Sequence, residues 1–539
     1  MRHHAGAART VWQRPHGPCV SAFEEFLEAN RRFWRAAFAG YERADTALIE
    51  GSLGDEYLLH GILKVGLIFS RLNALKPVVS PPVLRRGARL ALIRSTCPTI
   101  VPIRWLLLTQ LMLKLPRLLR ALRGLRAGAD VVALEVAGAE IGPYIYDCVI
   151  GRFHVPTLEQ LTWRMRLYAA FLLLYFFAFR AAVRKYRVRL VVLHDPAYLC
   201  GLLFQICRVD RIKCINAINL TIFQMRRYLP DGDYTDHYRR VEPDVLTRIP
   251  DEGPWRLALD DYMQRRITGH LDDHDVLTAF SSDKIALTGA ELKRTYALAS
   301  ARPLVVLMAH VFADAPHAFG GVLFRDSYDW FLQSLRFLRR NGGINLLVKE
   351  HPSARLYGEQ GLLRRIMSGE GCEHLLLQAD VHTATVLRCA DYVVTCGGTI
   401  GVEFTVFGKV AVLGARPPYA GLGFTVEPTR LEEYRTLLSS SIQRLPPLTA
   451  KETLTAKKTA FVMFEMMDAY DESLELGGIK YHFQKQYDRE AFFRRVAEEN
   501  STPLETQRIF KVLRAFEDSR DPVLINWGKL NQSVTESAH

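Results

Sequence analysis

The sequence predicts an α/β protein with two successive doubly wound domains and extra helical segments at both ends. Three observations lead to this fold class. The 539 residues exceed the usual size of one compact domain. Short apolar stretches with strand character alternate with helical stretches, once in each half of the chain. A more polar, less regular region, about 220–298, separates the two series. Because such alternation is typical of parallel sheets covered on both faces, each series predicts one sheet.

The first series follows a mostly helical stretch over residues 1–60. It contains four apolar segments that we predict as buried strands: 63–70, 129–136, 186–195 and 212–219. Helical patterns lie between these segments, at 158–185 and 197–207. Strands that are apolar nearly throughout are expected where both faces of a sheet are covered.

The second series is more regular. Strands are predicted at 303–311, 344–352, 373–380, 391–398 and 409–415. Helices are predicted between them, at 327–343, 354–369, 382–390 and 399–408. We therefore expect four parts: a helical segment 1–60, a Rossmann-like domain with the interdomain region 61–298, a second Rossmann-like domain 299–430, and a helical segment 431–539. Two such domains facing a cleft form the architecture called GT-B, and ligands of open parallel sheets bind beyond the carboxyl ends of the strands.

Composition limits the partners. The net charge is +13, which suits anionic partners such as nucleotides, phosphorylated lipids or an acidic membrane face. No zinc-finger spacing, RNA-binding motif or arginine-rich tail occurs, so nucleic acid is not an expected partner. Nine cysteines without a C-x-x-C pair favour a reducing cytoplasm over a disulfide framework. The N-terminal residues lack the apolar core of a secretory signal, and we expect a cytoplasmic protein.

Two segments bear on membrane contact. Residues 167–179 form an apolar run that is shorter than the roughly 20 residues of a spanning helix, so we predict a buried helix. Residues 113–128, as a helix, place leucines on one face and Lys or Arg on the other, which is the pattern of interfacial helices. This segment is a candidate for peripheral contact with an anionic membrane at its inner face. The alternative is a surface helix whose leucines pack on the N-terminal sheet.

Candidate binding residues stand at strand ends in the second half. Lys349 and His351 end the strand 344–352, and Pro352 cannot continue its ladder. A buried lysine without a partner is costly, which favours a site over a core histidine. Gly397, Gly398 and Thr399 follow the strand 391–398 and open a helix. Thr399 suits an N-cap, and the two glycines let an anion approach the backbone N–H groups closely. Glu403, one turn later, is a candidate to accept hydrogen bonds from ribose hydroxyls. The alternative is that Gly-Gly-Thr is only a turn and a helix cap.

Other strand ends add weaker candidates. His310 and Tyr419 are expected near the same edge. The H-x-x-x-D-x-x-H spacing of His310, Asp314 and His317 matches no standard zinc set, and we predict no metal. In the first half, His194 and Asp195 follow the strand 186–195 and are candidates for a general base, with helix capping by Asp195 as the alternative.

These motifs resemble a known family. The runs HVFADAPH, INLLVKEHPSA and ADYVVTCGGTIGVEFTVFGKVAVLGARPPYAGLGFT, with GAEIGPYIYD and LHDPAYLCGLL upstream, resemble bacterial capsule and surface polysaccharide biosynthesis proteins over about residues 130–430. That group is GT-B glycosyltransferase-like and includes the capsule Kdo transferases. His351-Pro352 and Gly398-Thr399 are also similar to the two motifs with which bacterial sialyltransferases hold CMP. Their third motif, an acidic pair with glycine, has no clean counterpart, and His194-Asp195 stands nearest in kind.

The resemblance implies a glycosyltransferase that moves Kdo or another CMP-activated sugar to a glycan or glycolipid acceptor, without a cofactor. It also implies that residues 299–430 bind the nucleotide sugar and that the N-terminal domain faces the acceptor. In this scheme His351, Lys349 and the Gly398-Thr399 turn bind the donor phosphate, and Asp195 or His194 takes the acceptor proton. Three alternatives remain: a polyol-phosphate transferase using CDP-glycerol, a UDP-sugar epimerase, and a non-catalytic polysaccharide assembly subunit.

Overall fold

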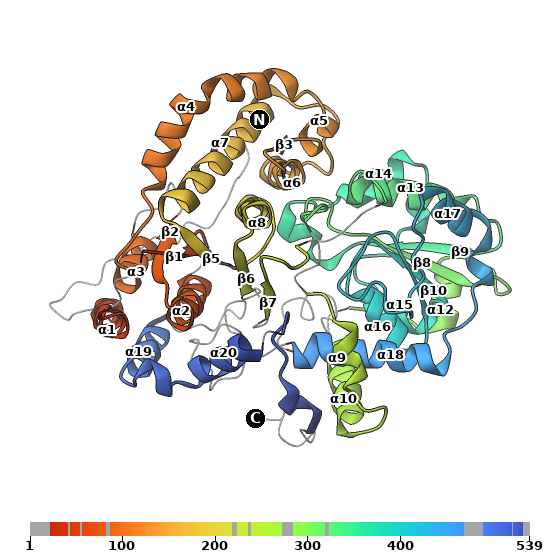
Figure 1. Cartoon of the computed structure of the whole chain (residues 1–539). Coiled ribbons are helices and arrows are strands. Elements are labelled where there is room, and N and C mark those ends of the chain that lie inside the picture. The colour runs from red at the N-terminus through yellow and green to blue at the C-terminus, as the bar shows by residue number, and fades with distance from the viewer. Residues whose placement is uncertain are drawn as a thin grey trace.

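The computed structural model contains two sheets that are each covered by helices (Figure 1). This arrangement confirms the predicted α/β class with two parallel sheets. The structure describes residues 22–40, 44–53, 56–81, 87–217, 224–234, 239–271, 284–318, 323–467, 489–519 and 521–531.

The N-terminal sheet has the strand order β2-β1-β5-β6-β7. Its first four members in space run parallel, and β7 pairs antiparallel with β6 at one edge. The strands are β1 (Thr46–Glu50), β2 (Lys76–Ser80), β5 (Val188–Leu193), β6 (Lys213–Ala217) and β7 (Met225–Tyr228). The helices around it are α1 (Ala22–Ala37), α2 (Glu56–Leu72), α3 (Ala88–Thr96), α4 (Ile103–Gly124), α5 (Gly128–Val132), α6 (Gly142–Phe153), α7 (Trp163–Lys185) and α8 (Tyr198–Asp210).

Two predictions for this half were wrong. The segment 63–70 is not a strand but the middle of helix α2, and the first strand is β1, inside the stretch expected to be helical. Helix α2 is buried all round, so its sequence shows an apolar run without helical periodicity, which cannot be told from a buried strand. The segment 129–136 is also not a strand, because it forms α5 and one side of a small hairpin, β3 (Glu135–Val136) with β4 (Ala139–Glu140).

The C-terminal sheet has the order β11-β10-β8-β9 and is parallel throughout. Four predicted strands are confirmed as β8 (Leu304–Met308), β9 (Asn345–Lys349), β10 (Tyr392–Thr395) and β11 (Val410–Leu413). The surrounding helices are α9 (Pro243–Thr247), α10 (Pro254–Thr268), α12 (Gly289–Thr295), α13 (Ser327–Arg339), α14 (Leu362–Gly369), α15 (Thr383–Cys389), α16 (Ile400–Val406), α17 (Leu431–Thr436) and α18 (Ala450–Phe461).

Two further predictions here were wrong. The segment 373–380 contains a 3-10 turn, Glu373–Leu375, and only a single bridge from Leu376 to β9, so it adds no strand. The helix expected over 354–369 is divided into a 3-10 turn, Pro352–Tyr357, and α14. Gly358 and Gly361 both have positive φ angles between these pieces, a conformation that ends a right-handed helix.

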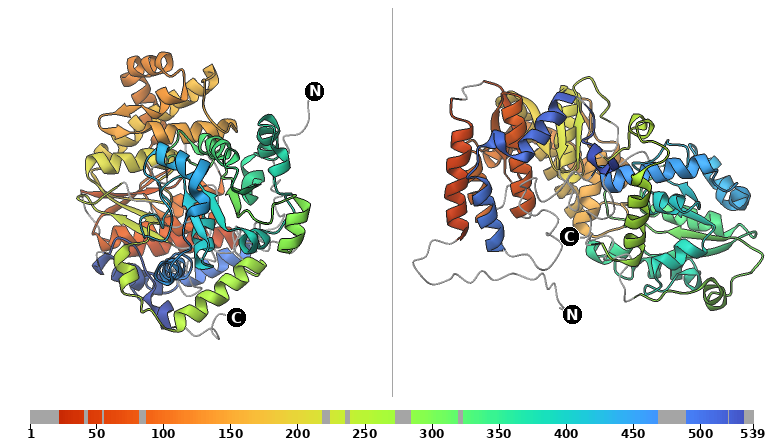
Figure 2. Two further views of the ribbon diagram at one scale, coloured as in Figure 1. Left: turned by 90° about the vertical axis from the view of Figure 1, so that its right-hand side faces the viewer. Right: turned by 90° about the horizontal axis from the view of Figure 1, so that it is seen from below.

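The last part of the chain returns to the N-terminal domain. Helix α18 packs on α16, whereas α19 (Arg489–Glu499) lies beside α1 and α20 (Arg508–Ser519) beside α2 (Figures 1 and 2). The Lys64 ammonium of α2 and the Glu499 carboxylate of α19 form a buried ion pair at 3.3 Å. The two domains are therefore joined along this return path as well as through residues 239–271.

Polar contacts also join the facing edges of the domains. The Tyr198 hydroxyl donates to Asp314 at 3.0 Å, and the His317 ring contacts the buried Asp147 carboxylate at 2.7 Å. The Tyr146 hydroxyl donates to Asp326, whose other oxygen caps α13. These bonds hold the start of α8 and the first half of α6 against the segment between β8 and α13.

Helix α7 has 23 residues and packs against α4. Among the described residues it is the one helix long and apolar enough to cross a membrane. Two-thirds of its most apolar window is buried inside the protein. The prediction that 167–179 is a buried helix is confirmed for most of the segment, whereas Leu167 and Phe171 are exposed.

Candidate active site

A crevice of about 100 Å³ opens at the carboxyl ends of β8, β9 and β10. The strand register explains why these ends meet: Met308 pairs with Lys349 on one side and with Thr395 on the other. Each strand then delivers the residues that follow it to the same edge of the sheet. The crevice is lined by Arg266, Met308, Ala309, His310, Lys349, His351, Pro352, Ser353, Thr383, Thr395, Gly398, Thr399, Ile400 and Glu403. Sequence reasoning had named six of these as site residues: His310, Lys349, His351, Gly398, Thr399 and Glu403.

His351 is a neutral hydrogen-bond donor in this crevice. Its Nδ1 accepts from the Ser353 N–H at 3.2 Å, so the proton of the neutral ring belongs on Nε2. Burial, together with the neighbouring His310, lowers the pKa of His351 to about 3. The two rings stack with centroids 5.9 Å apart. Near neutral pH, His351 therefore offers the crevice an N–H group without a charge.

Lys349 supplies the charge. Its side chain is only 5% exposed, and its Nζ donates to the Val381 carbonyl at 2.8 Å. Burial, and to a lesser extent Lys284, lowers its pKa to about 8. Since this value still lies above neutral pH, the group remains mostly an ammonium. Among the described residues one of its three N–H bonds is occupied, and an anion in the crevice would complete the others.

The turn before α16 leaves room for a ligand. Thr399 is the N-cap residue of α16, as predicted, but it lies in the right-handed helical region and its side chain makes no capping hydrogen bond. A Cβ atom at Gly398 would have its nearest neighbour at 3.5 Å, and one at Gly397 at 3.9 Å, which are ordinary contacts. Neither glycine is needed for packing inside the protein. Gly398 lines the crevice and Gly397 does not.

Two predicted ligand residues have partners within the protein. Glu403 is buried, and its Oε1 accepts from the Arg266 guanidinium at 2.9 and 3.1 Å. Tyr419 is fully buried outside the crevice and donates to the Gly398 carbonyl at 2.6 Å. Tyr419 therefore positions the turn from behind. Arg266 comes from α10, in the region that the sequence suggested was irregular, and no local signal marked it.

The residues of the H-x-x-x-D-x-x-H pattern go to three different places. His310 donates from Nδ1 to the Val311 carbonyl and stacks on His351. Asp314 binds Tyr198, and both ring nitrogens of His317 are occupied, by Asp147 and by the Arg325 carbonyl. These three side chains do not form a metal site.

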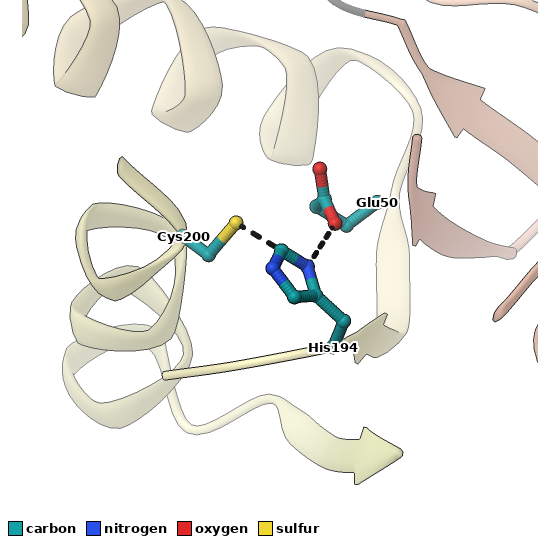
Figure 3. A group of neighbouring side chains, drawn as sticks. All are labelled: Glu50, His194 and Cys200. Carbon is teal, nitrogen blue, oxygen red and sulfur yellow. Dashed lines mark hydrogen bonds and ion pairs between the residues drawn. The ribbon is translucent and has the colours of Figure 1, made fainter. Parts of the chain in front are cut away.

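A second group of polar side chains lies at the carboxyl ends of β1 and β5, in the N-terminal domain (Figure 3). His194 Nδ1 lies 2.7 Å from Glu50 Oε2 and 3.9 Å from Cys200 Sγ. Burial acts to lower the pKa of His194, but the Cys200 sulfur and the Glu50 carboxylate outweigh it and raise that pKa well above its ordinary value. His194 is thus an imidazolium held by Glu50, whose other oxygen accepts from the Ser52 N–H.

This group is the one set of three possible metal ligands found in the described part of the chain. The 2.7 Å contact is a hydrogen-bond distance between two of the three ligand atoms, which fits an ion pair. Sequence reasoning missed Glu50 and Cys200. Glu50 would have been found if residues 46–50 had been interpreted as a strand, since it then stands at a strand end like Lys349.

Asp195, next to His194, has the properties of a base. Among the described residues its buried Oδ1 has no hydrogen-bond partner. Burial raises its pKa to about 6, with a smaller contribution from Asp314 of the facing domain, while the neighbouring His194 opposes the rise. The group is therefore an ionised carboxylate at neutral pH with one unpartnered oxygen. Its electrostatic contact with Asp314 places it toward the loop after β8 that also carries His310.

No protein-family model matches this chain, and no curated protein matches it. Among solved structures it is similar to KpsC, beta Kdo 2,4 transferase, of Thermosulfurimonas dismutans, with 15% identity over 50% of this chain and 79% of that one and a TM-score of 0.30. The beta Kdo 2,7 transferase KpsC of the same organism is 13% identical over 57% and 85%, with a TM-score of 0.28. Anabaena Alr3699/HepE in complex with UDP-glucose is 12% identical over 85% and 99%, with a TM-score of 0.25. At this distance the similarities carry no argument about function, which has to come from the side chains around the crevice.

Proposed function

We propose that this protein is a glycosyltransferase that moves a sugar from a nucleotide donor to a capsule or surface polysaccharide acceptor. The observation that carries the proposal is the meeting of His351, Lys349 and the Gly398-Thr399 turn in one crevice, at the edge of a parallel sheet. An N–H donor, a buried ammonium and an open glycine turn together suit a phosphate ester. A CMP-activated sugar such as Kdo is the donor class that the motifs suggest.

The reaction needs a base and a stabilised leaving group. The acceptor hydroxyl gives its proton to the Asp195 carboxylate, and its oxygen forms a bond to the anomeric carbon. The bond between that carbon and the donor phosphate oxygen breaks, and its electron pair stays on the phosphate. Lys349 and the His351 N–H then face the new negative charge, which is stabilisation aimed at the position where charge develops.

The unpartnered Oδ1 favours Asp195 over His194 as the base. An imidazolium cannot accept a proton, and His194 is held in that state by Glu50. His194 is then a positioning residue whose positive charge keeps the adjacent carboxylate ionised. Because Lys349 supplies a cation at the leaving group, we predict that transfer requires no metal and no cofactor. We also predict that the protein is cytoplasmic.

The proposal is tested first by ligand binding. The full chain is titrated with CMP, CDP and UDP while its thermal denaturation is followed. We expect CMP to raise the melting temperature, since a ligand at one hundred times its dissociation constant stabilises by about 2.7 kcal/mol. Stabilisation by CDP together with turnover of CDP-glycerol would replace the proposal with polyol-phosphate transfer. Turnover of a UDP-sugar without an acceptor would replace it with epimerisation, and no shift with any nucleotide would favour an assembly subunit.

Transfer and donor hydrolysis are then measured with CMP-Kdo for His351→Ala. Loss of one such donor is expected to lower kcat by about 100- to 1,000-fold. His374→Ala is the matched control, because His374 is exposed and lies away from the crevice lining. Activity of His351→Ala within a few-fold of the wild type, in folded protein, would remove the crevice from the mechanism.

A further inference from the structure

Helix α4 has two apolar faces, and only one of them is used inside the protein. Ile103, Leu107 and Leu118 are buried against the domain. On the other side of the helix, five large apolar side chains are exposed at alternating spacings of three and four residues, which places them in one stripe. This exposed stripe consists of Trp105, Leu108, Met112, Leu115 and Leu119. The helix runs along the outer edge of the N-terminal domain, beside α7 (Figure 1).

The stripe is too large for an ordinary solvent-facing helix. Trp105 is 70% exposed and Met112 is 77% exposed. The neighbouring α7 adds three more exposed apolar side chains near its start, Trp163, Leu167 and Phe171. Contiguous apolar surface of this kind marks a place where another surface docks.

The charge around the stripe indicates which kind of surface docks on it. Residues 98–129 contain no Asp or Glu. Arg117, Arg120 and Arg123 are exposed in the second half of α4, and within the described ranges no ion pair involves them. A second copy of this chain would bring the same basic helix against itself, with repulsion between like charges. An anionic lipid surface complements both the apolar stripe and the arginines.

We propose that α4, with the start of α7, docks the protein on an anionic membrane leaflet. The stripe would enter the boundary between headgroups and acyl chains, with Trp105 in the zone that indole rings prefer, and the arginines would contact lipid phosphates. This surface is larger than the segment 113–128 marked by the sequence, because it begins at Trp105. It is also separate from the crevice, so the proposal stands independently of the proposed reaction.

The test is co-sedimentation of the full chain with vesicles. One set is phosphatidylcholine alone, and the other is phosphatidylcholine mixed with phosphatidylglycerol. We expect wild type to bind the mixed vesicles, with a blue shift of tryptophan fluorescence that Trp105→Phe reduces. Trp105→Ser/Met112→Ser should weaken partitioning by about tenfold or more, since apolar burial drives insertion. Arg117→Gln/Arg120→Gln/Arg123→Gln should remove most of the preference for the mixed vesicles over phosphatidylcholine, since basic residues near an anionic surface are attracted to it.

The matched control is Leu257→Ser/Leu356→Ser, which removes exposed leucines elsewhere, 66% and 56% accessible, and should bind vesicles like wild type. Thermal denaturation establishes that each variant is folded. The proposal is overturned if wild type does not bind the mixed vesicles, or if the stripe variant binds them as well as wild type does. It is also overturned if light scattering shows that the stripe holds two copies together in solution and vesicles fail to separate them.

Discussion

The crevice of the C-terminal domain and the polar group of the N-terminal domain are built alike and charged differently. In both, a histidine stands just beyond a parallel strand and is partly buried. Burial acts to lower the pKa of both rings. His351, with His310 beside it, has a pKa of about 3, whereas Cys200 and Glu50 outweigh burial at His194 and raise its pKa well above the ordinary value. The strand end brings a side chain to the cleft, and the partner from another strand decides its protonation state.

The same comparison applies to the two groups proposed for catalysis. Burial moves each toward its neutral form: it lowers the pKa of Lys349 to about 8 and raises that of Asp195 to about 6. Neither shift crosses neutral pH, so the crevice keeps a cation and the facing domain keeps a carboxylate. This pairing suits a reaction in which a proton leaves one substrate and negative charge appears on the other.

The largest expected effect separates the two regions directly. Asp195→Asn keeps the size of the side chain but cannot take a proton, so kcat for transfer should fall by about 100- to 10,000-fold. Nucleotide affinity should stay unchanged, because the crevice is intact. Asp518→Asn on α20 is the control, since Asp518 is exposed and far along the chain from the site. Wild-type kcat in Asp195→Asn would show that the base is elsewhere.

Glu50→Gln tests whether the carboxylate creates the difference between the histidines. The change should destabilise the fold by about 1–3 kcal/mol. The loss is not larger because His194 can release its proton and become neutral once the carboxylate is gone. A histidine with a raised folded pKa stabilises below its unfolded pKa and loses this contribution as pH rises through the folded value. Glu50, whose pKa is lowered, loses its contribution as pH falls through that lowered value.

The difference in unfolding free energy between wild type and Glu50→Gln should therefore be largest between the ordinary values of 4.5 and 6.5, and should shrink at high pH. Urea denaturation at several pH values measures it. A difference that does not vary with pH would mean that the contact is not an ion pair.

Gly398, just before α16, and Gly401, in the first turn of α16, should separate effects on stability from effects on binding. A Cβ at Gly401 would lie 2.1 Å from the Tyr419 hydroxyl, so Gly401→Ala should cost about 1–3 kcal/mol. Gly398→Ala meets nothing closer than 3.5 Å and should change stability by no more than about 0.5 kcal/mol, yet weaken nucleotide binding. Thermal denaturation and nucleotide titration of both variants distinguish the two roles. Unchanged affinity in Gly398→Ala would mean that no phosphate approaches this backbone.

The last prediction concerns the pH dependence of transfer. Because a general base must be ionised, kcat/KM should fall about tenfold per pH unit below about pH 6, the pKa of Asp195. The residual activity of Asp195→Asn should lack this acid limb. A limb that persists unchanged in the variant would assign the titration to another group.

The C-terminal domain was predictable because its signals are local. Strands β8 to β11 are four or five residues long and mostly apolar, and three of them end within a few residues of proline or glycine. Lys349 and His351 could be placed at the edge of the sheet from chain order alone. In the N-terminal domain, α2 has the same apolar composition as a strand, and nothing local distinguishes a helix buried all round from a buried strand.

The sequence by itself determined which side chains stand at strand ends, because the residues that end a short strand, such as proline and glycine, lie next to it in the chain. Only the tertiary structure decided their partners: Glu50 for His194, Arg266 for Glu403, and Tyr419 behind the turn at Gly398. Each of these contacts joins residues from separate elements, 144, 137 and 21 positions apart. Charge state and hydrogen bonding depend on distance in space, which the order of residues does not contain.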